Sequence, residues 1–255
     1  MQVPPAVVAA CMDAQPTLVV LPGLDGTGLL TTPLLDALAA RGVPAQVLRY
    51  PQDGPQDYAT LAARVRLQLP QTPFVLLGES FAGPLAVLLA AQAPPALRGV
   101  VLSTTFAHRP VPVPAAFANL LAPAWPLPPL AVLVPLLLGR WCTGEIRQAL
   151  EKALNEVPAN VLRQRAAATL RVDARKPLRS LQVPLLGLLA RHDRLLWPIS
   201  VQALQRLAPQ ARWVTLDGPH LLLQARADAA AGVIADWLRG YVAQQPARQA
   251  IGRTP

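Results

Sequence analysis

The chain has 255 residues, of which 53% are apolar and 15% charged, and its formal net charge is +9. This length and apolar content are enough for one sizeable core, so we expect a single α/β domain. The positive charge comes almost entirely from scattered arginines, since lysine occurs only at positions 152 and 176. Because there is no dense basic tract and no basic motif rich in aromatic residues, we expect no nucleic-acid partner.

The two cysteines, Cys11 and Cys142, are too few and too far apart in sequence to predict a disulfide framework or a metal site. Val8-Ala-Ala-Cys11 has the pattern of a lipobox, but a positive segment and a long apolar stretch are missing before it, so secretion is not expected. We interpret residues 1–16 as an N-terminal lead-in and predict a cytoplasmic protein that needs no cofactor.

Strand-like and helix-like segments alternate along almost the whole chain, which predicts a mostly parallel sheet covered by helices on both faces. The predicted strands cover residues 17–21, 46–50, 74–78, 99–103, 184–190 and 212–216. The predicted helices cover residues 31–41, 57–69, 83–93, 199–207 and 221–242. Residues 243–255 show no apolar period, and we predict a flexible tail there.

The first predicted strand runs into a glycine-rich stretch, Pro22-Gly-Leu-Asp-Gly-Thr-Gly28. A loop of this kind after a strand can bind phosphate, but the spacing G-x-G-x-x-G and the Lys-Ser or Lys-Thr pair of a P-loop are both missing. A plain glycine-rich turn and a loop that offers main-chain N–H groups to a catalytic site are the two interpretations that stay open.

A second turn follows the apolar run Phe74-Val-Leu-Leu77, where Gly78-Glu-Ser-Phe-Ala-Gly83 leads into an alanine- and leucine-rich segment. This order predicts a buried strand, a tight turn and a helix. A serine at such a turn matches the nucleophile elbow, which holds the hydroxyl out above the edge of the sheet. Small residues are needed two positions to either side of the serine; Gly78 meets this need, and Ala82 departs from G-x-S-x-G by one methyl group. An ordinary structural turn is the alternative.

A serine hydroxyl needs a base to become a nucleophile, and the base needs a group that orients it. The chain has three histidines, at positions 108, 192 and 220. In a fold with a nucleophile elbow, the catalytic histidine comes last in the chain, on a loop after the final strand. Only His220, in Asp217-Gly-Pro-His220, fits this order, and we predict it as the base for Ser80.

The orienting acid is expected between the serine and the histidine in the chain. Asp193 follows the predicted strand 184–190 and therefore lies at the carboxyl end of a parallel strand, where active-site groups gather. Asp217 is the main rival, although its place three residues before the histidine favours a role in capping the local turn. Glu79, next to the serine, is interpreted as a supporting hydrogen-bonding group.

Residues 105–180 separate two predicted strands and are expected to form a helical cap insertion. Within this insertion, residues 110–139 carry no charge, but eight prolines leave no uninterrupted helix of the roughly 20 residues that a bilayer requires. We therefore expect no membrane span, but an apolar flap that lines an acyl pocket or makes transient contact with an interface. Trp125 and Trp141 are candidate substrate-binding residues, and ordinary packing within the cap is the alternative for both.

The glycine-rich loop, the turn around the serine and the segment Asp217-Gly-Pro-His220 together resemble the α/β-hydrolase superfamily, and within it small bacterial serine hydrolases. The first two motifs are also similar to the esterase/lipase/thioesterase-like domain of plant phytyl ester synthases. The resemblance covers roughly residues 17–240. It implies an α/β-hydrolase fold over residues 17–242, with the cap insertion placed over the active site.

The resemblance also implies a catalytic triad of Ser80, Asp193 and His220 and an oxyanion hole formed by the main-chain N–H groups of Leu24 and Phe81. The sequence departs from the common pattern in two places, with Pro-Gly where the oxyanion loop often has His-Gly, and with alanine at the end of the elbow. Neither departure removes a catalytic atom, so they bear on the subfamily and the substrate.

We expect an esterase or thioesterase that cleaves a small-molecule acyl ester or thioester through an acyl-enzyme intermediate. Acyl transfer to an alcohol or thiol is the closest variant, because only the acceptor differs. Haloperoxidase-like and carbon–carbon bond hydrolase activities share the same triad. A non-catalytic binding protein with this fold, or a membrane-associated scaffold that uses residues 110–139, would belong to a different functional class.

Overall fold

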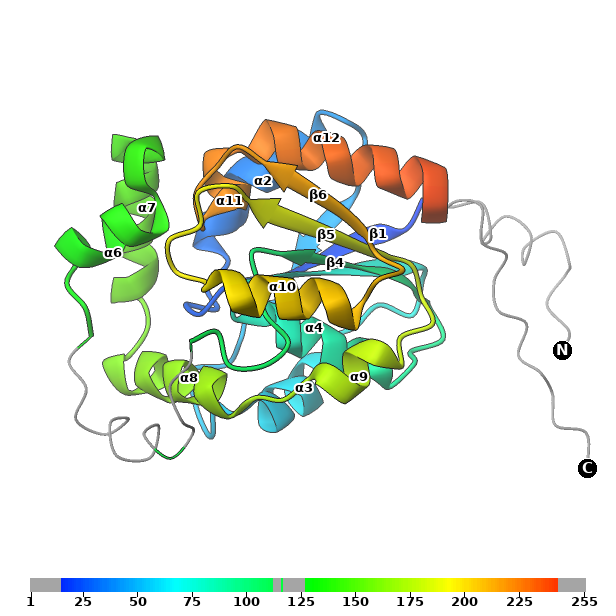
Figure 1. The fold of residues 1–255 in the computed structure, drawn as a ribbon, viewed down its shortest axis with the longest axis horizontal. Coiled ribbons are helices and arrows are strands. Elements are labelled where there is room, and N and C mark those ends of the chain that lie inside the picture. The colour runs from blue at the N-terminus through cyan, green and yellow to red at the C-terminus, as the bar shows by residue number, and fades with distance from the viewer. Residues whose placement is uncertain (1–14, 112–115, 117–126, 243–255) are drawn as a thin grey trace, which may run out of the picture.

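A six-stranded parallel sheet forms the centre of the computed structural model, which describes residues 15–111, 116 and 127–242 (Figure 1). The strand order is β2-β1-β3-β4-β5-β6, and all neighbouring strands are parallel. The strands are β1 (Thr17–Leu21), β2 (Ala45–Val47), β3 (Phe74–Glu79), β4 (Leu97–Ser103), β5 (Leu185–Ala190) and β6 (Arg212–Leu216). The parallel sheet predicted from the alternation of segments is therefore confirmed, and β2 is shorter than predicted.

Helices cover both faces of the sheet (Figure 1). One face packs against α3 (Tyr58–Arg66), α4 (Ala82–Ala91), α9 (Arg175–Arg179) and α10 (Pro198–Leu207). The other face packs against α2 (Thr32–Ala39), α11 (Leu222–Ala225) and α12 (Ala227–Trp237). Successive residues of β1 show why two separate cores form: Val19 and Leu21 enter the first core, whereas Leu18 and Val20 enter the second.

The long helix predicted over residues 221–242 is divided in the structure. Arg226 has φ −133° and ψ 37°, outside the helical region, and it separates α11 from α12. A π-helical turn, η3 (Leu238–Val242), completes the segment. A short 3₁₀ turn also precedes α2, at η1 (Leu29–Thr31).

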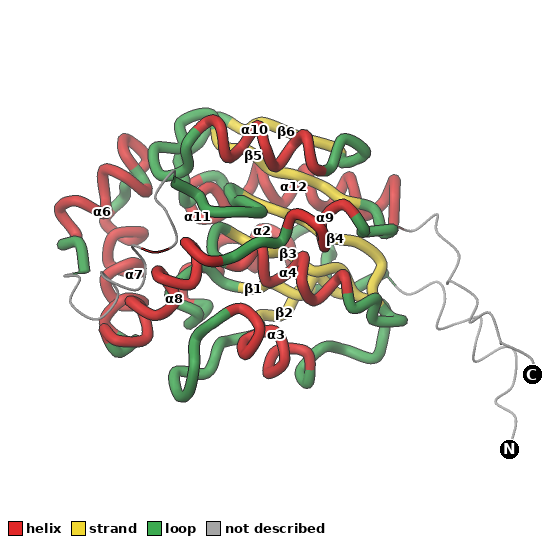
Figure 2. Tube along the Cα trace, turned by 60° about the horizontal axis from the view of Figure 1, so that its bottom comes forward, coloured by secondary structure: helices red, strands yellow, loops and turns green. Residues whose placement is uncertain are grey.

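The helices between β4 and β5 include α6 (Leu130–Leu137), η2 (Gly139–Trp141), α7 (Gly144–Asn155) and α8 (Ala159–Arg171). Figures 1 and 2 show α6 and α7 beside the end of the sheet toward which β5 and β6 point. Leu138, the residue after α6, and Leu150 of α7 pack against Leu30 of η1 and against Leu221, the residue before α11. The insertion is therefore anchored to loops at the carboxyl ends of the strands.

No helix in the described part of the chain is long and apolar enough to cross a membrane. The helix α6 lies within the uncharged segment, and it has only eight residues and contains Pro135. The predictions for Trp125 and for the tail at 243–255 fall outside the described residues, as does nearly all of the lead-in. The division into a domain over residues 17–242 and a cap over residues 105–180 stays a prediction.

The close contact between β5 and β6 leads to a prediction about stability. A Cβ atom added to Gly187 would overlap the indole ring of Trp213, its partner in the register of these strands. The ring is also held by a hydrogen bond of 3.2 Å from its Nε1 to the carbonyl of Ala208. We expect Gly187→Ala to lower the free energy of unfolding by about 1–3 kcal/mol in urea denaturation, because the extra methyl overpacks the site.

The control for this measurement is Gly144→Ala, because a Cβ at Gly144 would meet no atom within 4 Å. If both variants unfold at the same urea concentration as the unmodified chain, the indole ring can move aside and the contact does not restrict position 187.

Candidate active site

The turn between β3 and α4 places Ser80 in a backbone conformation that is rare for a residue with a side chain. Its φ is 52°, in the left-handed region. Two backbone hydrogen bonds hold the turn, from the N–H of Ser80 to the carbonyl of Ser103 at 3.0 Å and from the N–H of Gly83 to the carbonyl of Ser80 at 3.1 Å. The predicted strand, tight turn and helix are therefore present, and the turn carries the strain typical of functional sites.

The small residues around the turn explain why alanine is tolerated in the motif. A Cβ at Gly78 would lie 2.5 Å from the carbonyl oxygen of Ala82, and a Cβ at Gly83 would overlap the side chain of Thr105. The methyl group of Ala82 itself is buried within the core on this side of the sheet. The positions that require glycine are therefore 78 and 83, and the departure at position 82 leaves the turn intact.

Ser80, His220 and Asp193 come together at the carboxyl ends of three strands. The Nε2 atom of His220 lies 2.9 Å from Oγ of Ser80, and its Nδ1 atom lies 2.8 Å from Oδ2 of Asp193. The side chain of His220 is 2% exposed and that of Asp193 is 8% exposed. In this arrangement an imidazole that donates its Nδ1–H to the carboxylate can accept the serine proton at Nε2.

The carboxylate of Asp193 is oriented by its own loop. Its Oδ1 atom accepts hydrogen bonds of 2.9 Å from the main-chain N–H groups of Leu195 and Leu196. These bonds leave Oδ2 directed at the imidazole. A fixed carboxylate of this kind holds the imidazole in one tautomer and one orientation.

The rival acid, Asp217, has other partners. Its Oδ1 atom lies 2.9 Å from Nε2 of His192, and its Oδ2 atom lies 3.5 Å from the guanidinium of Arg140. Since both ring nitrogens of His220 are already engaged, the geometry favours Asp193 as the orienting acid. Asp217, directly after β6, thereby links the loop after β5 to η2, which differs from the turn-capping role expected for it.

Trp141 belongs to the same cluster at the edge of the cap. Its indole ring lies 5.1 Å from the ring of His192, and the guanidinium of Arg140 lies 4.2 Å from its centre. These contacts match the alternative that Trp141 packs between the cap and the loops, while its role in substrate binding stays a prediction.

Leu24 and Phe81, the predicted donors of an oxyanion hole, lie on rigidly held loops. Phe81 is the N-cap residue of α4, and its carbonyl accepts a hydrogen bond of 2.8 Å from the hydroxyl of Tyr58. Its ring stacks on that of Tyr58 at 4.8 Å. On the loop that carries Leu24, the hydroxyl of Tyr50 donates to the carbonyl of Pro22 at 2.8 Å. Both tyrosines lie outside the motifs, so sequence reasoning missed them.

Glu79, the last residue of β3 and the neighbour of the serine in the chain, is buried. Its Oε2 atom accepts a hydrogen bond of 2.9 Å from Nε2 of Gln224 on α11, a partner that the sequence did not indicate. Burial raises the pKa of Glu79 to about 7, although the bond from Gln224 and the charge of His220 oppose the shift. The interpretation of Glu79 as a hydrogen-bonding support agrees with this contact.

The described residues contain no group of histidine, cysteine and acidic side chains that could hold a metal ion. They do form a pocket of about 370 Å³ between the N-terminal end of α3 and the helix α8. Its lining comprises Pro55, Gln56, Asp57, Tyr58, Gln164, Ala167, Ala168, Arg171 and Val172. Because Ser80 and His220 are not among these residues, we do not assign this pocket to the reacting bond.

The order of the strands, the elbow at Ser80 and the serine–histidine–aspartate geometry together define a protein with the α/β-hydrolase fold. A family model described as "Serine aminopeptidase, S33" matches residues 48–221, more than half of the chain. The chain belongs to this family and is a hydrolase of the α/β type. Membership of the superfamily is thus confirmed, whereas the similarity to phytyl ester synthases stays a prediction. No curated protein matches the chain significantly.

Several solved structures share the fold at low sequence identity. An enol-lactonase from Burkholderia xenovorans LB400 is 21% identical, with a TM-score of 0.73 over 89% of this chain and 92% of that one. A bromoperoxidase from Bacillus anthracis is 15% identical, with a TM-score of 0.74 over 89% and 92% of the two chains. A lipase-esterase related protein from Clostridium acetobutylicum ATCC 824 is 15% identical, with a TM-score of 0.72 over 88% and 95%.

The buried carboxyl of Glu79 leads to a prediction about pH and stability. Its pKa is 4.5 in an unperturbed chain and about 7 in the fold, so the folded state keeps the proton to higher pH. The stabilisation that this gives is complete below pH 4.5 and is lost as the pH rises through about 7. We expect the unmodified chain to lose about 2–3 kcal/mol more than Glu79→Gln between pH 5 and pH 8 in urea unfolding.

The control is Glu151→Gln, which removes an exposed carboxyl on α7 and should leave the pH dependence unchanged. Parallel stability curves for Glu79→Gln and the unmodified chain would mean that Glu79 is already ionised at pH 5.

Proposed function

We propose that this protein is a serine hydrolase that cleaves a carboxylic ester or thioester through an acyl-enzyme intermediate. The observation that carries the proposal is the continuous chain of contacts from Oγ of Ser80 through His220 to Asp193, at 2.9 Å and 2.8 Å. In this proposal Ser80 is the nucleophile, His220 the general base and acid, and Asp193 the group that orients the imidazole.

In the first step, Oγ of Ser80 attacks the carbonyl carbon of the substrate while Nε2 of His220 takes the hydroxyl proton. The negative charge that develops on the carbonyl oxygen is stabilised by the main-chain N–H groups of Leu24 and Phe81. The imidazolium then gives its proton to the leaving alcohol or thiol as the carbonyl re-forms. The acyl group is left on Ser80.

In the second step, His220 takes a proton from water, and the resulting nucleophile attacks the acyl carbonyl. Collapse of the second tetrahedral intermediate releases the carboxylic acid and returns the proton to Ser80. If an alcohol or thiol replaces water as acceptor, the same residues perform acyl transfer. The product distribution in the presence of an added alcohol distinguishes the two reactions.

The proposed substrate class is supported by the site and by the names of the family and of proteins that share the fold. An enol-lactonase and a lipase-esterase related protein, both named for ester chemistry, share the fold, while the family description names an aminopeptidase. A panel of p-nitrophenyl esters and acyl-CoA thioesters of graded length, with an aminoacyl p-nitroanilide beside them, compares the three bond types directly.

The proposal also covers the location of the protein in the cell and its contact with an interface. We place the enzyme in the cytoplasm, with residues 110–139 in transient contact with an apolar interface. Support for the contact comes from α6 and its N-terminal flank, where Val132 is 52% exposed and Leu127 is 36% exposed.

The assignment of the nucleophile gives a direct test. Ser80→Ala and His220→Ala should each lower kcat by about 10⁴-fold or more, and the double variant should be no worse, because the two residues act as one unit. A fluorophosphonate probe should label the unmodified chain at Ser80, as located by peptide mass spectrometry. Labelling at another serine, or unchanged turnover by Ser80→Ala, would refute the assignment and favour a binding protein or a different site.

The choice of acid gives a second test. Asp193→Asn should lower kcat/KM by up to about 10⁴-fold, because the amide favours the wrong tautomer of the imidazole. Asp217→Asn should cost about tenfold or less, since it disturbs only the contacts with His192 and Arg140. Both variants are measured on one activated ester. A greater loss in Asp217→Asn would make Asp217 the acid.

A further inference from the structure

The guanidinium of Arg165 is buried where the cap meets the loops at the edge of the sheet. Arg165 lies on α8 and is 0% exposed. Arginine is almost never fully buried without partners, because its side chain stays charged and an unpaired buried charge is costly. The partners of this guanidinium therefore show which part of the molecule it holds.

Two of its hydrogen bonds go to the loop after β1. The Nη1 atom of Arg165 donates to the carbonyl oxygens of Leu24 at 3.0 Å and Asp25 at 2.6 Å. The preceding carbonyl, that of Gly23, accepts from the N–H of Gly26 at 3.1 Å. The carbonyl of Gly23 and the N–H of Leu24 belong to the same peptide group, and the two point in opposite directions in a trans peptide. The bond from Gly26 therefore directs the N–H of Leu24 away from Gly26. Arg165 fixes the next two peptide planes, those that contain the carbonyls of Leu24 and Asp25.

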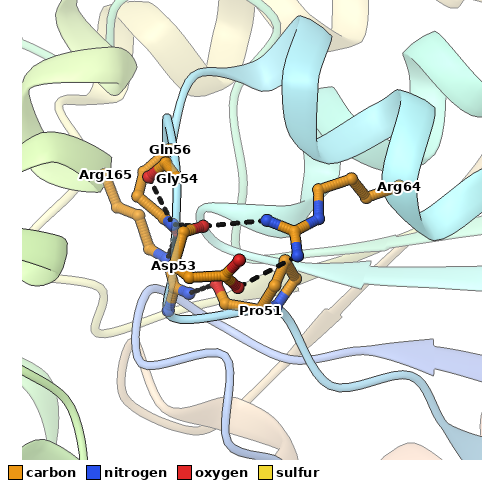
Figure 3. Close-up of polar contacts among 6 residues, drawn as sticks. All are labelled: Pro51, Asp53, Gly54, Gln56, Arg64 and Arg165. Atoms are coloured by element: carbon orange, nitrogen blue, oxygen red, sulfur yellow. Dashed lines mark hydrogen bonds and ion pairs between the residues drawn. The ribbon is translucent and has the colours of Figure 1, made fainter.

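The other two hydrogen bonds tie the same guanidinium to the loop after β2 (Figure 3). Its Nε atom donates to Oε1 of Gln56 at 2.9 Å, and its Nη2 atom donates to the carbonyl of Pro51 at 3.0 Å. Arg64 on α3 binds this loop as well, at the carbonyl and the carboxylate of Asp53, at 2.8 Å and 3.0 Å (Figure 3). The side chain of Arg64 is 37% exposed, so it offers a comparison on the outer side of the loop.

Apolar packing between the cap and the same loop is separate from these polar contacts. The side chain of Leu24 packs against Val157, Val161 and Leu162 of the cap. This packing keeps the loop close to α8 but sets no direction for its peptide groups, because the hydrophobic effect is non-directional. Direction comes from the hydrogen bonds of the planar guanidinium, which a lysine reproduces only in part.

We propose that Arg165 is a positioning residue for the oxyanion hole, which holds the peptide planes around Leu24 so that its N–H meets the charge that develops on the substrate. The inference rests on the proposed function, since it gives a reason for the geometry of one of the two donors. Through Arg165, the helix α8 would then contribute to the stabilisation of the transition state.

The test compares Arg165→Met, Arg165→Lys and Arg64→Met on one p-nitrophenyl ester. The end point of fluorophosphonate labelling at Ser80 gives the fraction of active sites, and kcat is expressed per labelled site. We expect Arg165→Met to lower kcat by about 100-fold, with KM within threefold of the unmodified value, because misplacement of a donor affects the transition state alone. Arg165→Lys should lose about tenfold, and Arg64→Met should stay within threefold.

A purely structural role would instead lower the melting temperature and the labelled fraction, with kcat per labelled site unchanged. That result, or an equal loss in Arg64→Met, overturns the inference and leaves the proposed function standing. If Arg165→Met does not fold, Arg165→Lys decides by the same comparison. A wild-type chain that hydrolyses none of the panel and takes no label at Ser80 overturns the proposed function and the inference with it.

Discussion

The close approach of α4 to β3 is the constraint on which the site depends. The helix can begin directly after the strand only because no side chain stands at Gly78 or Gly83, where a Cβ would run into Ala82 or Thr105. The chain must then reverse within one residue, and Ser80 takes the left-handed conformation with φ 52°. This strain costs of order 1–3 kcal/mol, which the buried strand and helix on either side can offset. The hydroxyl is thereby held at the edge of the sheet, within reach of His220.

The parallel direction of the strands brings the other residues of the site to the same edge of the sheet. Because all six strands run in one direction, the loops after β1, β3, β5 and β6 meet at one edge. The last three of these loops carry Ser80, Asp193 and His220, although 140 positions separate Ser80 from His220, and the first carries Leu24, the proposed oxyanion donor. The separation in sequence therefore gives no measure of the separation in space, and only the fold brings the residues together.

The features that could be predicted from the sequence are those that leave a local pattern. The elbow at Ser80 is visible because the close approach demands small residues at fixed spacing, and the strands are visible because burial on both faces demands apolar runs. Asp193 could be inferred because the end of a parallel strand marks the edge where sites form. The break at Arg226 could not be inferred, because the apolar period continues through it.

The contacts that the sequence did not reveal join residues far apart in the chain. Gln224 meets Glu79, and Arg165 meets the loop after β1, in each case across more than a hundred positions. An arginine in a helix normally indicates a solvated face, and nothing in the neighbourhood of position 165 shows that this one is buried. Such pairs follow from the packing of whole elements, so they become predictable only once the fold is known.

The cap is bonded to the catalytic edge on two sides, which bears on how it can move. On one side α8 reaches the loop of Leu24 through Arg165. On the other side the N–H of Leu221, next to the histidine, donates to the carbonyl of Leu137 in α6 at 3.0 Å. A displacement of the whole cap would break polar contacts with both the loop of Leu24, the proposed oxyanion donor, and the loop of His220, the proposed base. Entry of substrate therefore requires less disruption if α6 and α8 stay in place.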